Sequence, residues 1–350
     1  MLDDGLLSKL PDILPDTCPA SSYVVISDSV VAPLYAEQLA KRIAETAPTH
    51  LITFPAGERH KTRKTWSTLT DQMLATGVGR DGAVIAVGGG VVGDMAGFVA
   101  ATYLRGIPYV QVPTTLLAMI DSSIGGKTGV DTRAGKNLVG AFHQPKFVAA
   151  DVASLETLPP NQFAAGIAEG IKHGAIADSA YLTRVMEQHS QIVARDPDAV
   201  ISLVARSIEI KVAVVTEDER ETGRRAVLNF GHTVGHAVEA ASGYSLLHGE
   251  AVAIGMAVEA DLGTRLGVTE ADTVDVLRSA LELFGLPVSV PGDAKVAAIL
   301  AAMRYDKKTR DGAIRFALLR RPGEIARPGD GSWTHQVDEI DIGASLERSF

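Results

Sequence analysis

The chain has 350 residues and a formal net charge of −9, with 46% hydrophobic and 21% charged residues. This balance excludes a largely disordered chain, and the acidic charge disfavours general nucleic-acid binding, which requires clustered lysine and arginine. Cys18 is the single cysteine, so no intrachain disulfide can form and a reducing compartment fits best. Residues 1–5 lack the features of a signal peptide, and the longest uncharged stretch, 106–120, is too short to span a membrane. We therefore expect a cytoplasmic protein.

The first half of the chain alternates predicted strands with predicted helices. Short runs rich in β-branched residues predict strands at 23–27, 51–54, 83–87, 109–112 and 147–150, with helical patterns at 34–47 and 64–76. Because these strands are almost wholly apolar and alternate with helices, we expect a parallel sheet covered on both faces.

The second half is predicted to be mostly helical. Helical spacing covers 163–176, 180–194, 197–216, 231–241, 249–266 and 270–284, and 315–319 is one late strand. We therefore predict an α/β domain over residues 1–158 and a mostly α-helical domain over residues 159–350. The expected functional site is a cleft between them.

A glycine-rich turn, Gly88-x-Gly90-x-x-Gly93, directly follows the third predicted strand and opens a helical stretch. Glycines in this context let backbone N–H groups approach a pyrophosphate, although an ordinary tight turn is the alternative for the bare pattern. The standard Rossmann fingerprint also requires an acidic residue about 20 positions later. Residues 95–120 contain no Asp or Glu, so Asp28 and Glu58 become the candidates. We interpret the turn as a Rossmann-like dinucleotide site of a different family.

Three histidines and one carboxylate are candidate metal ligands. His232 and His236 are four residues apart, His248 follows 16 residues after His232, and Glu169 lies on an otherwise apolar predicted helix. Two histidines and one glutamate with an open position are typical of a catalytic zinc site. The alternative is that the histidines only cap and pack helices, and spacing alone leaves open which of the three bind metal.

Several basic and amide side chains accompany these candidates. Taken singly, such residues are more often solvated surface groups. Lys172, however, follows Glu169 by three residues, and Arg225 and Asn229 lead into His232 at helical spacing. A metal with several cations suits a small substrate that bears phosphate and carboxylate groups. The set comprises Lys127, Lys136, Asn137, Lys172, Lys211, Arg225, Asn229, Lys307 and Lys308.

Together these segments resemble the dehydroquinate synthase family, from about residue 57 to residue 319. The resemblance rests on ordered motifs at 88–94, 113–117, 121–128, 135–137, 168–172, 228–236, 248–252 and 306–308. Two departures stand near the nucleotide turn: Val30 replaces a common asparagine, and Ala56 replaces a common acidic residue.

The resemblance implies a metal centre, a cofactor site and a substrate site. Zn²⁺ or Co²⁺ would be bound by Glu169, His232 and His248, which leaves His236 on the substrate side. NAD contacts are implied at Asp28, Gly57, Glu58, Lys61, Gly89, Gly90, Val91, Val92, Gly93, Asp94, Thr114, Thr115, Lys127, Lys136, Ser154, Leu155, Glu156 and Thr157. Substrate or catalytic roles are implied for Asp121, Lys127, Lys136, Asn137, Lys172, Lys211, Arg225, Asn229, His236 and one of Lys307 or Lys308. Arg105 would come from a partner subunit, which implies a homodimer.

The implied activity is the shikimate-pathway conversion of 3-deoxy-D-arabino-heptulosonate 7-phosphate to 3-dehydroquinate and phosphate. It would proceed by transient oxidation with NAD, phosphate elimination, re-reduction and intramolecular aldol closure, with a metal as Lewis acid. One alternative is a sister sugar phosphate cyclase. Another is a metal-dependent dehydrogenase of the glycerol dehydrogenase type, which has no need of the lysine set. A third is a non-catalytic NAD sensor, which would leave the metal and lysine residues unexplained.

Overall fold

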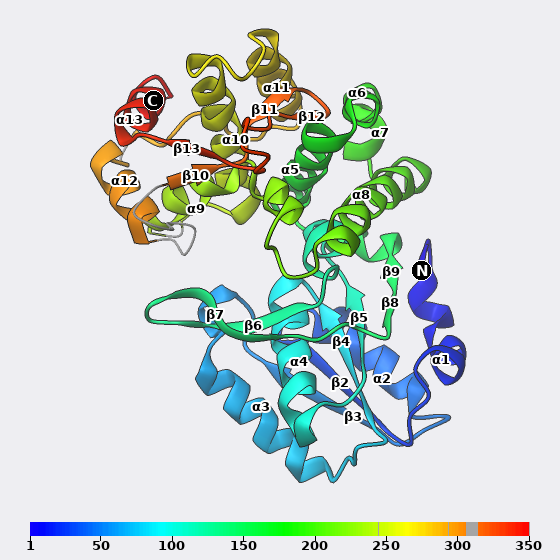
Figure 1. Cartoon of the computed structure of the whole chain (residues 1–350). Helices are drawn as coiled ribbons and strands as arrows, with labels where there is room; N and C mark the ends of the chain where they lie inside the picture. Colours follow the sequence, from blue (N-terminus) through cyan, green and yellow to red (C-terminus); the bar gives the residue numbers. More distant parts are fainter. Residues whose placement is uncertain (244, 293, 306–313, 350) are drawn as a thin grey trace. The chain divides into compact units, whose positions relative to one another are not determined.

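The computed structural model describes residues 1–243, 245–292, 294–305 and 314–349. The chain divides into two compact units, Met1–Leu158 and Pro159–Phe350 (Figure 1). No helix in the described part of the chain combines the length and hydropathy needed to span a bilayer.

The first unit is built on a five-stranded, wholly parallel sheet, as predicted. Its strand order is β3-β2-β4-β5-β8. The strands are β2 (Tyr23–Asp28), β3 (Thr49–Phe54), β4 (Ala83–Gly88), β5 (Tyr109–Pro113) and β8 (Phe147–Val148).

Both faces of this sheet are buried because alternate side chains of each strand enter different cores. Val24 and Ile26 of β2 pack in the core formed with α3 (Arg63–Thr76) and α4 (Gly90–Thr102). Val25 belongs to the opposite core, which includes residues of α1 (Leu6–Thr17) and α2 (Glu37–Ile43). Burial on two sides explains why these strands read as continuous apolar runs.

The strand predicted over 147–150 is wrong as a single element. β8 ends at Val148, and β9 (Ala150–Asp151) leaves the main sheet to pair with β1 (Leu2–Asp3). Both pieces are extended, so their local sequence cannot show that they join different partners.

An antiparallel hairpin was not predicted. It consists of β6 (Lys127–Thr132) and β7 (Gly135–Phe142). Most of β7 is exposed, so it lacks the alternating pattern of a half-buried strand. A Cβ added to Gly140 would lie 2.0 Å from the Thr128 carbonyl oxygen, so the two strands approach at a distance that requires glycine.

The second unit is mostly helical, as predicted. Two short antiparallel pairs join β10 (Ile314–Phe316) to β13 (His335–Val337) and β11 (Leu319–Arg321) to β12 (Glu324–Ile325). The helices are α5 (Pro160–Ala177), α6 (Ser179–Glu187), α7 (His189–Val193), α8 (Pro197–Glu217), α9 (His232–Ala241), α10 (His248–Arg265), α11 (Asp272–Leu283), α12 (Val296–Tyr305) and α13 (Glu339–Glu347).

Two predicted elements of this unit are each divided in two. The helix expected over 180–194 is broken at Gln188, whose backbone leaves helical geometry, while apolar residues on both sides remain buried. The strand expected over 315–319 is interrupted after Phe316, because β10 and β11 pair with different strands. Hydrophobic periodicity detects burial and therefore continues across both breaks.

Three helices of the second unit approach one another closely through glycine. A Cβ added to Gly255 of α10 would lie 1.9 Å from the Gly231 carbonyl oxygen at the start of α9. A Cβ on Gly249, at the start of α10, would lie 1.9 Å from the Ala165 carbonyl oxygen of α5. These contacts bring the start of α9 against the middle of α10, and the start of α10 against the N-terminal half of α5.

Candidate metal and dinucleotide sites

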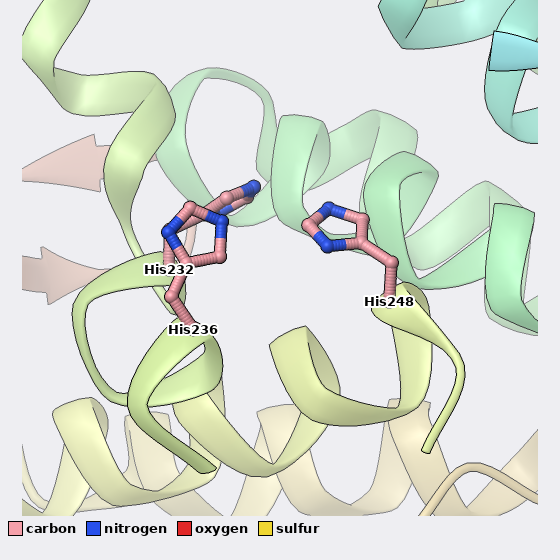
Figure 2. A group of neighbouring side chains, drawn as sticks. All are labelled: His232, His236 and His248. Atoms are coloured by element: carbon pink, nitrogen blue, oxygen red, sulfur yellow. The ribbon is translucent and has the colours of Figure 1, made fainter. Parts of the chain in front are cut away.

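The close helix packing gathers one carboxylate and three imidazoles. Glu169 lies on α5, His232 and His236 lie on α9, and His248 begins α10. Glu169 Oε1 is 3.4 Å from His232 Nε2 and 3.7 Å from His248 Nε2. One ring nitrogen from each of the three histidines lies within 4.8 Å of the others, and Figure 2 shows the rings turned toward one another.

These distances fit ligands of one metal ion better than they fit hydrogen bonds. Two ligand atoms each about 2.1 Å from a tetrahedral ion lie about 3.4 Å apart. His232 Nδ1 lies 3.2 Å from the Phe230 carbonyl oxygen, which can only accept, so Nδ1 donates and Nε2 is left with a lone pair. A lone pair and a carboxylate oxygen facing each other at 3.4 Å repel unless a cation lies between them. A nitrogen and oxygen donor set of this kind suits Zn²⁺ or Co²⁺.

The protonation states also fit metal ligands. Burial lowers the pKa of His232 to about 3, with a further contribution from the charge of Lys172, so this imidazole is neutral at pH 7. Burial alone would raise the pKa of Glu169. The Lys172, His232 and His248 side chains nevertheless hold that carboxyl well below its usual range. The group therefore presents an anion and a neutral imidazole.

The structure places Lys172 beside this group, as its spacing from Glu169 predicted. The Lys172 side chain is 1% exposed, and its Nζ contacts Glu169 Oε2. A buried cation with one carboxylate partner at the edge of a candidate metal group could also meet an anionic substrate.

Arg225 and Asn229 lie in one ordered segment. Asp218 Oδ2 accepts a hydrogen bond from the Arg225 backbone N–H at 2.9 Å, and the Arg225 guanidinium donates to the Glu219 carbonyl oxygen. The Asn229 side-chain amide donates to Glu221 Oε1 at 2.7 Å. Arg225 is buried, at 3% exposure.

The remaining basic residues predicted in this unit have different placements. Lys211 is a buried residue of α8. Lys307 and Lys308 lie outside the described residues.

In the first unit, the glycine turn joins β4 to α4. Gly88 ends the strand, Gly89 is extended, and α4 begins at Gly90. A Cβ would lie 2.5 Å from Val92 Cγ2 at Gly88 and 3.0 Å from Ser122 Oγ at Gly90. The turn therefore has no room for side chains at Gly88 and Gly90. A phosphate can approach the backbone N–H groups at the start of the 13-residue helix α4.

Lys61 links this turn to the β6–β7 hairpin. Its Nζ lies 2.5 Å from Asp94 Oδ2 and donates to Asn137 Oδ1 at 2.6 Å. Glu58 Oε1 lies 3.9 Å from Lys61 Nζ and 3.8 Å from Lys136 Nζ. Five residues with predicted cofactor or substrate roles thus form one network.

Other predicted cofactor residues lie at or just after the carboxyl ends of β2, β5 and β9. Asp28 Oδ1 accepts from the backbone N–H groups of Val30 and Val31, and the Thr114 N–H donates to the Gly88 carbonyl oxygen. The segment Val152–Thr157 is tied to Tyr35, whose hydroxyl donates to the Ser154 carbonyl oxygen at 2.9 Å.

Three further predicted active-site residues of this unit lie in other elements. Lys127 is exposed at the start of β6, and Asp121 lies in the helical turn Ala118–Ser122. Arg105 is exposed with φ +68, directly after Leu104 at φ +49. Two consecutive non-glycine residues in the left-handed region are strained, and such strain concentrates at functional positions.

Two buried carboxylates were missed. Counted as whole residues, Glu239 of α9 is 5% exposed and Glu259 of α10 is 0% exposed. The signal that singled out Glu169, an acid on an apolar helix, also applies to Glu259, which lies between Val258 and Ala260. Only the structure shows that Glu239 faces His248, because they belong to different helices.

Comparisons with known proteins agree with this architecture. Residues 51–165 match the family described as 3-dehydroquinate synthase N-terminal, and residues 166–309 match 3-dehydroquinate synthase C-terminal. The chain belongs to the 3-dehydroquinate synthase family. A 3-dehydroquinate synthase from Nitrosomonas europaea is 47% identical over 94% of this chain and 89% of that protein. One from Syntrophotalea carbinolica is 45% identical over 98% of this chain and 92% of that protein.

Solved structures similar to this family member include two sugar phosphate cyclases. A 2-deoxy-scyllo-inosose synthase complexed with carbaglucose-6-phosphate, NAD⁺ and Co²⁺ has a TM-score of 0.93 at 29% identity, over 100% of this chain and 96% of that chain. The 2-epi-5-epi-valiolone synthase ValA of Streptomyces hygroscopicus, with NAD⁺ and Zn²⁺ bound, has a TM-score of 0.89 at 31% identity, over 99% and 95%. A probable glycerol dehydrogenase from Sinorhizobium meliloti, at 16% identity and a TM-score of 0.66 over 99% and 95%, shares the fold.

Proposed function

We propose that this chain converts 3-deoxy-D-arabino-heptulosonate 7-phosphate to 3-dehydroquinate and phosphate, using NAD and a divalent metal ion. The observation that carries the proposal is the group formed by buried Glu169 and His232 with the partly exposed His248, and with Lys172 beside it. In a chain of this family, such a group combines a place for a Lewis acid with a cation for an anionic substrate.

We assign the metal to Glu169, His232 and His248, with Zn²⁺ or Co²⁺ as the ion. When bound, the metal would polarise a substrate hydroxyl and favour its deprotonation. His236 has a nitrogen near those of His232 and His248 and is the competing third ligand. The geometry of Glu169 favours the first set, because Lys172 contacts Oε2 while Oε1 faces both His232 Nε2 and His248 Nε2. His236 is then left to the substrate.

We assign the NAD pyrophosphate to the backbone of residues 89–93, at the start of α4. NAD supplies a reversible hydride acceptor when bound, and the cofactor ends each turnover unchanged. Asp94 and Lys61 would hold the ribose or nicotinamide side of the cofactor through their shared network. The remaining assigned contacts are Asp28, Gly57, Glu58, Thr114, Thr115, Lys127, Lys136 and residues 154–157.

We assign the substrate's charged groups to basic side chains. Lys172 and Arg225 are buried cations, and each would stabilise a phosphate or carboxylate more strongly than an exposed cation would. Phosphate departure spreads negative charge, so cations placed before the reaction would lower its barrier. Lys127, Asn137, Lys211, Asn229, Asp121 and one of Lys307 or Lys308 complete the set.

Sequence similarity supports this reaction over its alternatives. The curated 3-dehydroquinate synthases are 45% and 47% identical to the chain, whereas the two sister cyclases are 29% and 31% identical. The glycerol dehydrogenase likeness, at 16% identity, supports the fold alone.

The reaction is tested by incubating the purified enzyme with the heptulosonate phosphate, NAD and Zn²⁺ or Co²⁺. Inorganic phosphate and absorbance at the NADH wavelength are followed together. Phosphate release without net NADH is the expected result, because the hydride returns to the product. Stoichiometric NADH would identify a dehydrogenase instead. A carbocyclic product other than 3-dehydroquinate would identify a sister cyclase.

We further propose a cytoplasmic homodimer. The single cysteine, Cys18, is buried and free, which fits a reducing compartment. The strained turn at Leu104 and Arg105, in which Arg105 is exposed, supports a role for Arg105 toward a partner subunit.

A further inference from the structure

The imidazole of His248 lies between two carboxylates. Its Nε2 is 3.7 Å from Glu169 Oε1, and its Nδ1 is 3.6 Å from Glu239 Oε2. Glu239 lies near the end of α9, outside the proposed ligand set, and its side chain is 7% exposed. The two nitrogens of one ring therefore face two different anions.

This geometry determines which nitrogen of His248 can bind a cation. A neutral imidazole carries one donor and one acceptor nitrogen, and an ionised carboxylate can only accept. A proton on Nδ1 faces the Glu239 carboxylate at 3.6 Å and leaves the Nε2 lone pair directed toward Glu169. The opposite tautomer would place a lone pair against the Glu239 carboxylate.

His232 has the same arrangement with a different partner. Its Nδ1 faces the Phe230 carbonyl oxygen at 3.2 Å, and its Nε2 faces Glu169 Oε1 at 3.4 Å. In both imidazoles Nδ1 thus faces an oxygen acceptor, and Nε2 faces the same carboxylate oxygen, Glu169 Oε1. Outer partners of this kind fix the tautomer and ring orientation of metal-binding histidines and raise their basicity.

We propose that Glu239 is a positioning residue of the metal centre, which orients the His248 ring so that Nε2 points toward the ion. This inference rests on the proposed function, because it requires that His248 bind metal. Glu239 acts through His248 and does not itself contact the ion.

The test measures metal affinity in the absence of substrate and NAD. The full-length wild type, Glu239→Gln and Glu239→Leu are stripped of metal, and the dissociation constant for Zn²⁺ is measured by competition with a chromophoric chelator. The visible absorption of the Co²⁺-loaded proteins reports the geometry at the ion. Asp261→Asn is the matched control. Asp261 is a poorly exposed carboxylate like Glu239, but it lies on α10 and pairs with Arg348.

We expect the Zn²⁺ dissociation constant to rise about 10-fold in Glu239→Gln and toward 100-fold in Glu239→Leu. The glutamine keeps an oxygen acceptor for Nδ1 and should retain more of the wild-type Co²⁺ spectrum than leucine. The control should keep both the affinity and the spectrum. A merely structural role for Glu239 would lower thermal stability without moving the Co²⁺ spectrum.

Wild-type Zn²⁺ affinity and an unchanged Co²⁺ spectrum in Glu239→Gln would overturn this inference. If His248→Ala loses the metal in the same experiment, the proposed metal centre stands without it. If the wild type binds Zn²⁺ no more tightly than His248→Ala, both the metal centre and the role of Glu239 are overturned. Glu239→Gln decides the question even if the leucine variant fails to fold.

Discussion

Lys61 and Asp94 form a buried ion pair, with Nζ 2.5 Å from Oδ2 and side chains 4% and 18% exposed. The pair ties the loop after β3 to the first turns of α4, and Lys61 also donates to Asn137 of the hairpin. One side chain thus joins three segments that the sequence separates by up to 76 positions.

Lys61→Met should therefore destabilise the protein. It leaves the Asp94 carboxylate largely buried without its cation, at an expected cost of about 3 kcal/mol. Urea unfolding of the purified variant measures this directly. The double variant Lys61→Met, Asp94→Asn should recover part of the loss, and equal stability of the single and double variants would contradict the ion-pair explanation.

Glu259 of α10 stabilises the start of α9. Its carboxylate accepts from the backbone N–H of Gly231 at 2.7 Å and of Val234 at 3.0 Å, where the capping residue Gly231 has no side chain. Glu259→Ala should lower the free energy of unfolding by about 2 kcal/mol, because two buried donors lose an anionic acceptor. The comparison uses metal-free protein in urea, with Asp261→Asn as the control. A change below about 0.5 kcal/mol would argue against this role.

Removal of a proposed ligand should abolish metal binding and turnover together. Glu169→Ala deletes the buried carboxylate, and His248→Ala deletes an imidazole from a different helix. Metal content by atomic emission and phosphate release from the heptulosonate phosphate are measured on the same samples. Wild-type enzyme stripped with a chelator should regain activity with Zn²⁺ or Co²⁺, whereas the variants should not. Full activity in a verified metal-free variant would contradict the proposed centre.

Arg105 is expected to act in the site of the partner subunit. Arg105→Ala and Glu169→Ala homodimers should each be nearly inactive, but exchange of their subunits should restore activity. A mixed dimer carries one complete site, so random mixing should give about a quarter of the wild-type activity. Mixtures no more active than their components would show that Arg105 acts within its own subunit or has no role.

Asp178 provides a pH-dependent contribution to stability. It caps α6 by accepting from the Tyr181 N–H at 2.9 Å and pairs with Arg206 at 2.8 Å. Burial tends to raise the pKa of Asp178, but the Tyr181 hydrogen bond and Arg206 lower it overall. A lowered carboxyl pKa stabilises the fold above the unfolded value of about 3.9, and the effect is lost as pH falls through the folded value.

Asp178→Asn should therefore cost about 0.5–1 kcal/mol at pH 7, since the partly exposed ion pair is weakened while an oxygen for capping remains. Urea unfolding of both proteins from pH 7 to pH 2.5 is the measurement. The difference between them should shrink at the acid end. A difference that stays constant with pH would exclude the carboxylate charge as its source.

Local sequence patterns were sufficient to predict the alternation of strands and helices in the first unit and the helical character of the second. Both depend on local patterns: buried parallel strands are continuously apolar, and amphipathic helices repeat every 3.6 residues. The glycine turn could also be read locally, because its glycines lie within six residues of one another.

The sequence also supplied the candidate residues of the metal group, but not their arrangement. His232 and His236 could be placed on one helix face by spacing, whereas Glu169 and His248 belong to other helices. Their approach to 3.4–3.7 Å depends on glycines at 249 and 255, where the helix backbones touch.

The pairing of polar groups across elements, in contrast, depends on the tertiary fold. The Lys61 network, the capping of α9 by Glu259 and the contact of Glu239 with His248 all join residues distant in sequence or on separate helices. Local propensity carries no information about such pairs, because they form only when burial of the apolar faces has set the helix positions. The breaks at Gln188 and after Phe316 could not be predicted from the sequence, because they also depend on which elements pack or pair with each piece.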